Sequence, residues 1–137
     1  MAPILVRMSS SSSAGKRIMV VDDEKDIVMV ISKVLERWKF KVDGFSSPFK
    51  ALEAFRKEPD AFDLIITDVR MPGMSGPELV KEILAIRPQM SKIFISAFNL
   101  DHESFGAMPA EELKKDLLSK PVTMPQLCEA VKSKILK

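Results

Sequence analysis

The sequence predicts an α/β domain built on a five-stranded parallel sheet with helices on both faces. Short, continuous apolar runs alternate five times with segments of helical periodicity between Lys16 and the end of the chain. Such runs indicate strands that are covered on both faces, because a strand with one solvated face would alternate apolar and polar residues. The connections are short, which favours βα units that wind onto a single sheet.

The first two units are regular. The run RIMVV at Arg17–Val21 predicts a buried strand. Apolar residues recur at helical spacing over Ile27–Trp38, which predicts an amphipathic helix. Phe40–Phe45 is expected to form a second, weaker strand. Ser47-Pro48 then predicts an N-cap followed by a proline in the first turn of a helix that ends near Lys57.

Another helix separates the third and fourth strands. The run DLIIT at Asp63–Thr67 is the clearest strand in the sequence, and KIFIS at Lys92–Ser96 predicts the fourth strand. Between them, Gly76-Pro77 opens a helix whose apolar residues share one side. This helix should end before Pro88, because proline disfavours the helical conformation of the residue before it.

The fifth unit is less regular. A glycine and a proline within Asp101–Lys115 predict a broken helix that is strongest over Ala110–Lys115. Asp116–Ser119 should form a short fifth strand. Thr123 with Gln126 three residues later matches a capping box, which predicts a last helix that runs to the chain end.

Composition narrows the class of protein. The 137 residues suffice for one domain, expected over residues 16–137 after a flexible, serine-rich tail over residues 1–15. The net charge of +2 comes from 21 basic and 19 acidic side chains spread along the chain, which argues against a nucleic-acid surface. No apolar run approaches the roughly 18 residues of a membrane span. The single cysteine, Cys128, fits a reducing cytoplasm.

Polar side chains with related chemistry lie at the ends of four of the predicted strands. They are Asp22-Asp23, Asp68, Ser96 and Lys120, at the carboxyl ends of the first, third, fourth and fifth strands. The carboxyl ends of parallel strands meet at one edge of a sheet, so we expect these side chains to converge. Taken singly, each has an ordinary structural explanation as a turn, helix-start or loop residue. Their joint placement favours a functional site.

Three carboxylates, a hydroxyl and an ammonium form a set suited to phosphoryl transfer. Neighbouring carboxylates repel each other and therefore favour a bound cation. Oxygen ligands of this kind suit Mg²⁺, with Mn²⁺ as the alternative. Asp68 would then act as a nucleophile towards phosphorus, while Lys120 and Ser96 stabilise the phosphoryl oxygens.

These motifs also resemble a known family. Asp22-Asp23-Glu24 after the first strand, DLIITDVRMPGMSG at Asp63–Gly76, ISA at Ile95–Ala97 and SKP at Ser119–Pro121 are similar to motifs of response-regulator receiver domains of two-component systems, of the chemotaxis-regulator type. The resemblance covers Lys16–Lys137. It implies a receiver domain with the flavodoxin-like, doubly wound strand order 2-1-3-4-5.

The resemblance also implies roles for the strand-end residues. Asp68 would accept a phosphoryl group from a phosphohistidine of a sensor histidine kinase or phosphotransfer protein, and Ser96 and Lys120 would hold that group. The implied Mg²⁺ ligands are Asp22 through water, Asp23, Asp68 and the backbone carbonyl of Arg70. The chain would assist its own phosphorylation and dephosphorylation without being an enzyme, and would signal to an unknown downstream protein.

Two features bear on how such a switch would work. Leu117 stands three residues before Lys120, where receiver domains usually carry an aromatic residue whose rotamer follows phosphorylation. We therefore expect a smaller or differently placed conformational change. In the family, the residues at Arg70 and Phe98 flank the path of the hydrolytic water. Neither can act as a general base, which predicts a long-lived phosphoryl group.

Other functions stay open at this point. A receiver fragment of a larger regulator or hybrid kinase would have the same sequence, although we expect no separate output domain after the last helix. A phosphatase that turns over through an aspartyl phosphate would want a second acid two residues after its nucleophile, where this chain has Arg70. A scaffold that accepts no phosphate would normally lack one of the key residues, and all of them are present.

Overall fold

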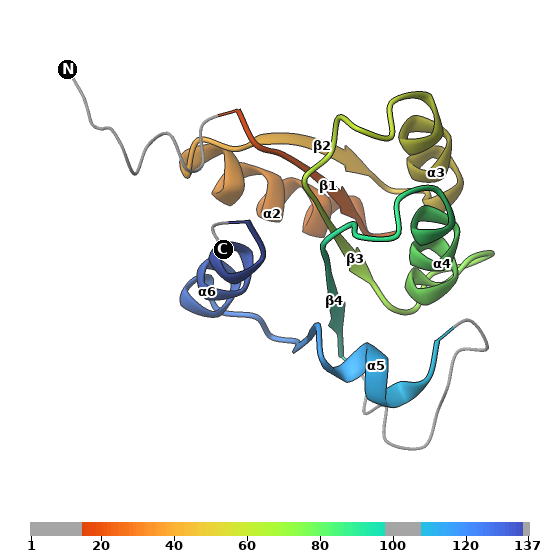
Figure 1. Ribbon diagram of the computed structural model, residues 1–137. Coiled ribbons are helices and arrows are strands. Elements are labelled where there is room, and N and C mark those ends of the chain that lie inside the picture. The colour runs from red at the N-terminus through yellow and green to blue at the C-terminus, as the bar shows by residue number, and fades with distance from the viewer. Residues whose placement is uncertain (1–14, 98–107, 136–137) are drawn as a thin grey trace.

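A computed structural model describes residues 15–97 and 108–135, which form one sheet covered by helices (Figure 1). The sheet has five strands in the order β2-β1-β3-β4-β5, and every neighbouring pair is parallel. This confirms the fold class and strand order expected from the sequence. The strands are β1 (Arg17–Val21), β2 (Lys41–Phe45), β3 (Leu64–Asp68), β4 (Lys92–Ser96) and β5 (Leu117–Ser119).

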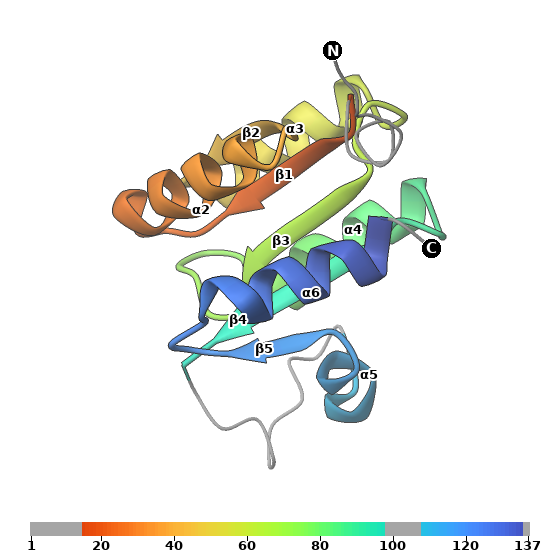
Figure 2. The same ribbon diagram turned by 90° about the vertical axis from the view of Figure 1, so that its left-hand side faces the viewer.

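Helices cover both faces of the sheet. Figure 2 shows α2 and α6 on one face, and α3 and α4 lie on the other. The short α5 contributes Leu113 to the core on the α3–α4 side. Within the described part of the chain, no helix is long and apolar enough to cross a membrane. The helices are α2 (Lys25–Arg37), α3 (Pro48–Lys57), α4 (Gly76–Ile86), α5 (Ala110–Lys114) and α6 (Met124–Ile135).

The two faces of the sheet carry separate cores. Because successive side chains of a strand point to opposite faces, Met19 and Ile65 pack towards α3 and α4. Ile18, Val20 and Ile66 pack towards α2 and α6. All five side chains are at most 1% exposed. Burial on both faces explains why the central strands consist of continuous apolar runs.

Four strand boundaries differ from the prediction by one residue: β2, β3 and β5 each begin one residue later than predicted, and β3 ends at Asp68 and not at Thr67. β3 begins at Leu64, because the backbone N–H and the carboxylate of Asp63 both bond to the Arg17 backbone at the start of β1, at 2.8 Å each. β2 begins at Lys41, because the N–H of Phe40 still donates to a carbonyl in the last turn of α2 (3.2 Å).

The helix starts follow the predicted capping signals. The Ser47 hydroxyl accepts a hydrogen bond from the Lys50 N–H (3.3 Å). Thr123 and Gln126 make both hydrogen bonds of the predicted capping box, at 3.0 and 3.2 Å. The later part of the broken helix predicted before the fifth strand corresponds to α5, which begins at Ala110. Its earlier part up to residue 107 lies outside the described residues, as do residues 1–14 of the predicted tail.

Candidate functional site

Asp22 and Asp23 follow β1 at the carboxyl edge of the sheet. The Asp22 N–H donates to the Phe45 carbonyl of β2 (3.1 Å), which keeps this residue in line with the strand. The Asp22 side chain is 4% exposed and accepts a hydrogen bond from the Glu24 N–H (2.9 Å). Asp23 is exposed. The pair therefore offers one fixed carboxylate inside the site and one at its rim.

Asp68 is the last residue of the central strand β3. Its side chain is 11% exposed, and its Oδ1 accepts a hydrogen bond from the Val69 N–H (2.9 Å). The first turn of α4 lies against this main chain, because the Gly76 N–H donates to the Val69 carbonyl (2.8 Å). A Cβ at Gly76 would overlap the Asp68 carbonyl oxygen. Only glycine allows this approach, so the glycine at position 76 lets the first turn of α4 lie directly against the Asp68 backbone.

Lys120 and Ser96 complete the set of strand-end residues. Ser96 ends β4 and is 1% exposed. The Lys120 N–H donates to the Ser96 carbonyl (2.8 Å), which joins the ends of two neighbouring strands. The Lys120 ammonium lies 3.6 Å from Asp22 Oδ2 and 3.8 Å from Asp68 Oδ1. One ammonium therefore bridges the buried carboxylate of Asp22 and the partly exposed carboxylate of Asp68.

The carboxylates at this edge lie close enough to share a cation. Oxygen atoms of Asp22, Asp23 and Asp68 all lie within 4.8 Å of one another. An all-oxygen, strongly anionic set of ligands fits a hard divalent cation such as Mg²⁺ or Mn²⁺. The cluster of Asp22, Asp23 and Asp68 is thus a candidate metal site.

Burial and repulsion change the protonation of this cluster. The pKa of Asp68 is raised to about 6, first because burial disfavours the charged carboxylate and second because Asp22 is close. Lys120 and the Val69 N–H oppose this shift. Burial also raises the pKa of Asp22, against the hydrogen bond from Glu24 and the charge of Lys120. Because burial disfavours the charged form of both carboxyl groups, a bound cation would favour their ionisation.

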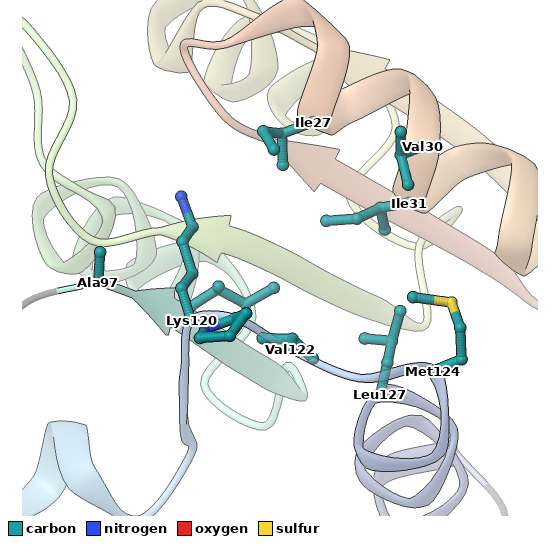
Figure 3. Close-up of a pocket in the computed structure, with 10 residues that line it drawn as sticks. Ile27, Val30, Ile31, Ala97, Lys120, Val122, Met124 and Leu127 are labelled. Carbon is teal, nitrogen blue, oxygen red and sulfur yellow. The ribbon is translucent and has the colours of Figure 1, made fainter.

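An apolar pocket of about 520 Å³ lies between α2 and the segment that leads into α6, and Lys120 connects it with the acidic cluster. Figure 3 shows Ile27 and Ile31 on one side, Val122 and Leu127 on the other, and Lys120 at one end with its ammonium directed away from Leu127. The aliphatic stem of Lys120 lines the pocket while its charge reaches the carboxylates. Packing of the stem therefore helps to hold the ammonium in the site.

The other residues named from the sequence surround the cluster or fall outside it. Arg70 is exposed in the loop after β3. Leu117 is half-buried in β5, pairs with Phe94 of β4 and packs against the α3–α4 core. Phe98 lies outside the described residues. The altered switch at Leu117 stays a prediction.

Two features near the site were not anticipated from the sequence. Ser75 and Glu78 form a reciprocal capping box at the start of α4, with hydrogen bonds of 2.8 and 3.2 Å. The S-x-x-E spacing could have revealed it. The close approach of Gly76 to the Asp68 carbonyl has no such local signal, because it depends on the distance between a helix and a strand.

Comparison with known sequences points to one family. A sequence profile of the response regulator receiver domain matches residues 18–132. The response regulator receiver protein CpdR of Brucella abortus is 29% identical over 123 residues, which cover 88% of this chain and 98% of CpdR. The sensor kinase CckA of the same organism is 28% identical over 132 residues, or 96% of this chain. The chain spans only 14% of the length of CckA.

A solved structure agrees with this result. The crystal structure of a response regulator receiver domain protein from Clostridium thermocellum superimposes with a TM-score of 0.77 and is 30% identical in sequence. The match covers 88% of this chain and 94% of that protein. Similarity in sequence and in fold therefore extends over nearly the same part of the chain.

Proposed function

The chain belongs to the response regulator receiver domain family, and on this premise we propose that Asp68 is its phospho-acceptor. Receiver domains are phosphoryl-accepting signalling switches of two-component systems, and this chain is such a switch. One observation carries the choice of residue. Asp68 ends the central strand within a cluster of three carboxylates, and its Oδ1 lies 3.8 Å from the Lys120 ammonium.

In the proposed reaction, a carboxylate oxygen of Asp68 attacks the phosphorus of a phosphohistidine on a sensor histidine kinase or phosphotransfer protein. A P–O bond forms and the P–N bond breaks, while the imidazole leaves with the electron pair and takes up a proton. Lys120 balances charge on the phosphoryl oxygens, and the Ser96 hydroxyl donates a hydrogen bond to one of them. The chain thus assists its own phosphorylation.

The metal site that we propose fits the donor atoms at this edge. Its residues would be Asp22 through water, Asp23, Asp68 and the backbone carbonyl of Arg70. Mg²⁺, or Mn²⁺ in its place, would neutralise the charge that gathers between carboxylates and phosphoryl oxygens. The raised pKa of Asp68 supports this assignment, because a nearby cation would favour the ionised, nucleophilic carboxylate.

We favour a regulator that acts on a downstream protein over two alternatives. The match to CpdR, a response regulator receiver protein, supports a receiver that acts as a response regulator. The match to CckA supports, as second candidate, a receiver segment of a hybrid kinase. Arg70 argues against a phosphatase that turns over, because such enzymes would want an acid there.

We propose a cytoplasmic location, on the basis of the expected kinase partner and the single cysteine.

Incubation with Mg²⁺ and acetyl phosphate, followed by measurement of the intact mass, tests the phospho-acceptor. The wild-type chain should gain one phosphoryl group that is stable in acid and labile in base. Asp68→Asn should gain none, whereas Asp60→Asn, which changes an exposed turn residue, should behave as wild type. A phosphoryl group on Asp68→Asn, or on a serine of residues 9–13, would contradict the assignment.

A further inference from the structure

The loop between β3 and α4, residues 69–75, carries the backbone carbonyl that we assign to the metal. Its first part is anchored, because Val69 is fully buried and donates to the Ile95 carbonyl (3.1 Å), and Met71 is 8% exposed. Its end is anchored where the Gly76 N–H meets the Val69 carbonyl (2.8 Å). The middle of the loop, Pro72-Gly73, is exposed. This middle part therefore depends on other contacts for its position.

The aromatic ring of Phe49 lies against the middle of this loop. Gly73 has a φ of +83°, a backbone conformation that favours glycine. A Cβ at Gly73 would lie 2.9 Å from Cε2 and 3.2 Å from Cζ of Phe49. The ring thus occupies the space that a side chain at this position would take. The two residues fit because one supplies a flat apolar surface and the other exposes its backbone.

Phe49 is presented by a well-fixed helix. The Phe49 side chain is 55% exposed, so it is not part of the core. The next turn of α3 is anchored by Ala51 and Leu52, which are 0% and 5% exposed. Pro48 in the first turn and the Ser47 cap set where the helix begins. The ring therefore meets the loop from a rigid position.

We propose that Phe49 is a positioning residue for the metal site. Buried Val69 and Met71 hold the chain on either side of Arg70, and the Phe49 ring holds the loop just beyond them at Gly73, which adds a further restraint on the peptide group that carries the Arg70 carbonyl. The inference rests on the proposed function. Mg²⁺ requires near-ideal octahedral geometry, so its affinity is sensitive to a turn of one ligand carbonyl.

Mg²⁺ affinity, measured by isothermal titration calorimetry, tests this role. Phe49→Ala should bind Mg²⁺ about three- to tenfold more weakly. Loss of a residue that orients a metal ligand typically weakens metal binding about 10- to 100-fold, and we expect the effect of Phe49 at or below the low end of that range. Phe49→Tyr keeps the ring and should retain the wild-type affinity. Ile86→Ala, at the opposite end of α4, removes another exposed apolar side chain and should change nothing. Asp23→Ala, which removes a proposed direct ligand, should weaken binding most.

Phosphorylation by acetyl phosphate at varied Mg²⁺ concentration should distinguish these variants in the same way. Phe49→Ala should need more Mg²⁺ for its half-maximal rate but approach the wild-type rate at saturating Mg²⁺. The reason is that none of the groups proposed to touch the phosphoryl oxygens has changed. General damage to the fold would instead lower the saturating rate and the melting temperature together, and that outcome would overturn the positioning role.

NMR of the metal-free protein tests the contact between the Phe49 ring and Gly73. The ring should displace the amide and α-proton resonances of Gly73, and this displacement should vanish in Phe49→Ala and persist in Phe49→Tyr. If Phe49→Ala binds Mg²⁺ as wild type does while Asp23→Ala is weakened, the positioning role is wrong and the proposed function stands. A wild-type chain that binds no Mg²⁺ would overturn both.

Discussion

The amino and carboxyl edges of the sheet differ in how many ammonium groups pair with each aspartate. At the amino edge, Asp116 has a side chain that is 9% exposed and pairs with Lys92 of β4 (3.2 Å) and with Lys134 of α6. At the carboxyl edge, Asp68 is 11% exposed, and it shares Lys120 with a second buried carboxylate. Asp116 thus pairs with two cations, whereas at the other edge Asp22 and Asp68 lie beside the same ammonium.

Charge balance separates a structural acid from a reactive one. A buried carboxylate with two ammonium partners is compensated, and its bonds tie together the elements that supply them. At the carboxyl edge, burial is the largest cause of the raised pKa values of Asp22 and Asp68, and neighbouring acids add to both shifts in spite of Lys120. Carboxylates whose ionisation is disfavoured by burial and by neighbouring acids would be stabilised by a further cation, as in the proposed metal site.

The largest effect is expected from removing the structural acid. Asp116→Ala leaves two lysine side chains, 19% and 25% exposed, without their shared partner. It should lower the free energy of unfolding by about 3 kcal/mol. Urea unfolding in the presence of EDTA measures the loss. Asp60→Ala, at an exposed turn, serves as the control and should change little. A loss below about 1 kcal/mol would mean that the amino edge stabilises the fold far less than its geometry indicates.

Removing a charge from the other edge should have the opposite sign. Asp68→Asn should raise the free energy of unfolding of the metal-free protein at neutral pH by about 2 kcal/mol. The pKa of Asp68 is about 6 in the folded chain, against about 3.9 when unfolded, so the folded chain binds more protons between these values. The stability that this group contributes is therefore fully present below about pH 4 and is lost as the pH rises through about 6.

The difference in stability between Asp68→Asn and wild type isolates this group from other titrations. It should be small near pH 4, grow as the pH rises, and level off above the pKa of Asp68. Saturating Mg²⁺ should reduce the difference, because it stabilises the folded wild type. A difference that stays constant over this pH range would contradict the raised pKa.

The convergence of the strand-end residues could be predicted from the sequence because it depends on topology. Once the apolar runs are taken as parallel strands, their carboxyl ends must share an edge. Asp22, Asp68 and Lys120 therefore meet in the structure as expected, although they are far apart in the chain. Their roles in phosphoryl transfer stay proposals.

Features that depend on long-range distances could not be predicted. The sequence places Asp63 in the third strand, but its bonds to the Arg17 backbone hold it just before β3. The contrast between Asp116 and Asp68 is also hidden, because Lys92 and Lys134 reach Asp116 from other elements. No local pattern distinguishes an acid that will be paired twice from one that will share its cation.

The smallest effect is expected at the rim of the carboxyl edge, where the exposed Arg70 follows Asp68 by two residues. Hydrolysis of an aspartyl phosphate requires a water molecule in line with the phosphorus. Arginine stays protonated at neutral pH, so Arg70 cannot take a proton from that water, and its guanidinium can instead lie over the phosphoryl oxygens. The phosphoryl group on the wild-type chain should therefore persist for minutes or longer.

Arg70→Asn should speed the loss of the phosphoryl group about threefold, or about 0.7 kcal/mol of barrier. Asparagine can hydrogen-bond the attacking water and no longer covers the phosphoryl oxygens. Intact mass, followed over time after removal of acetyl phosphate, measures the decay. Arg37→Asn, which removes an exposed arginine of α2, controls for the lost surface charge. If wild type loses its phosphoryl group within seconds, or if Arg70→Asn decays no faster than Arg37→Asn, then Arg70 does not shield the site.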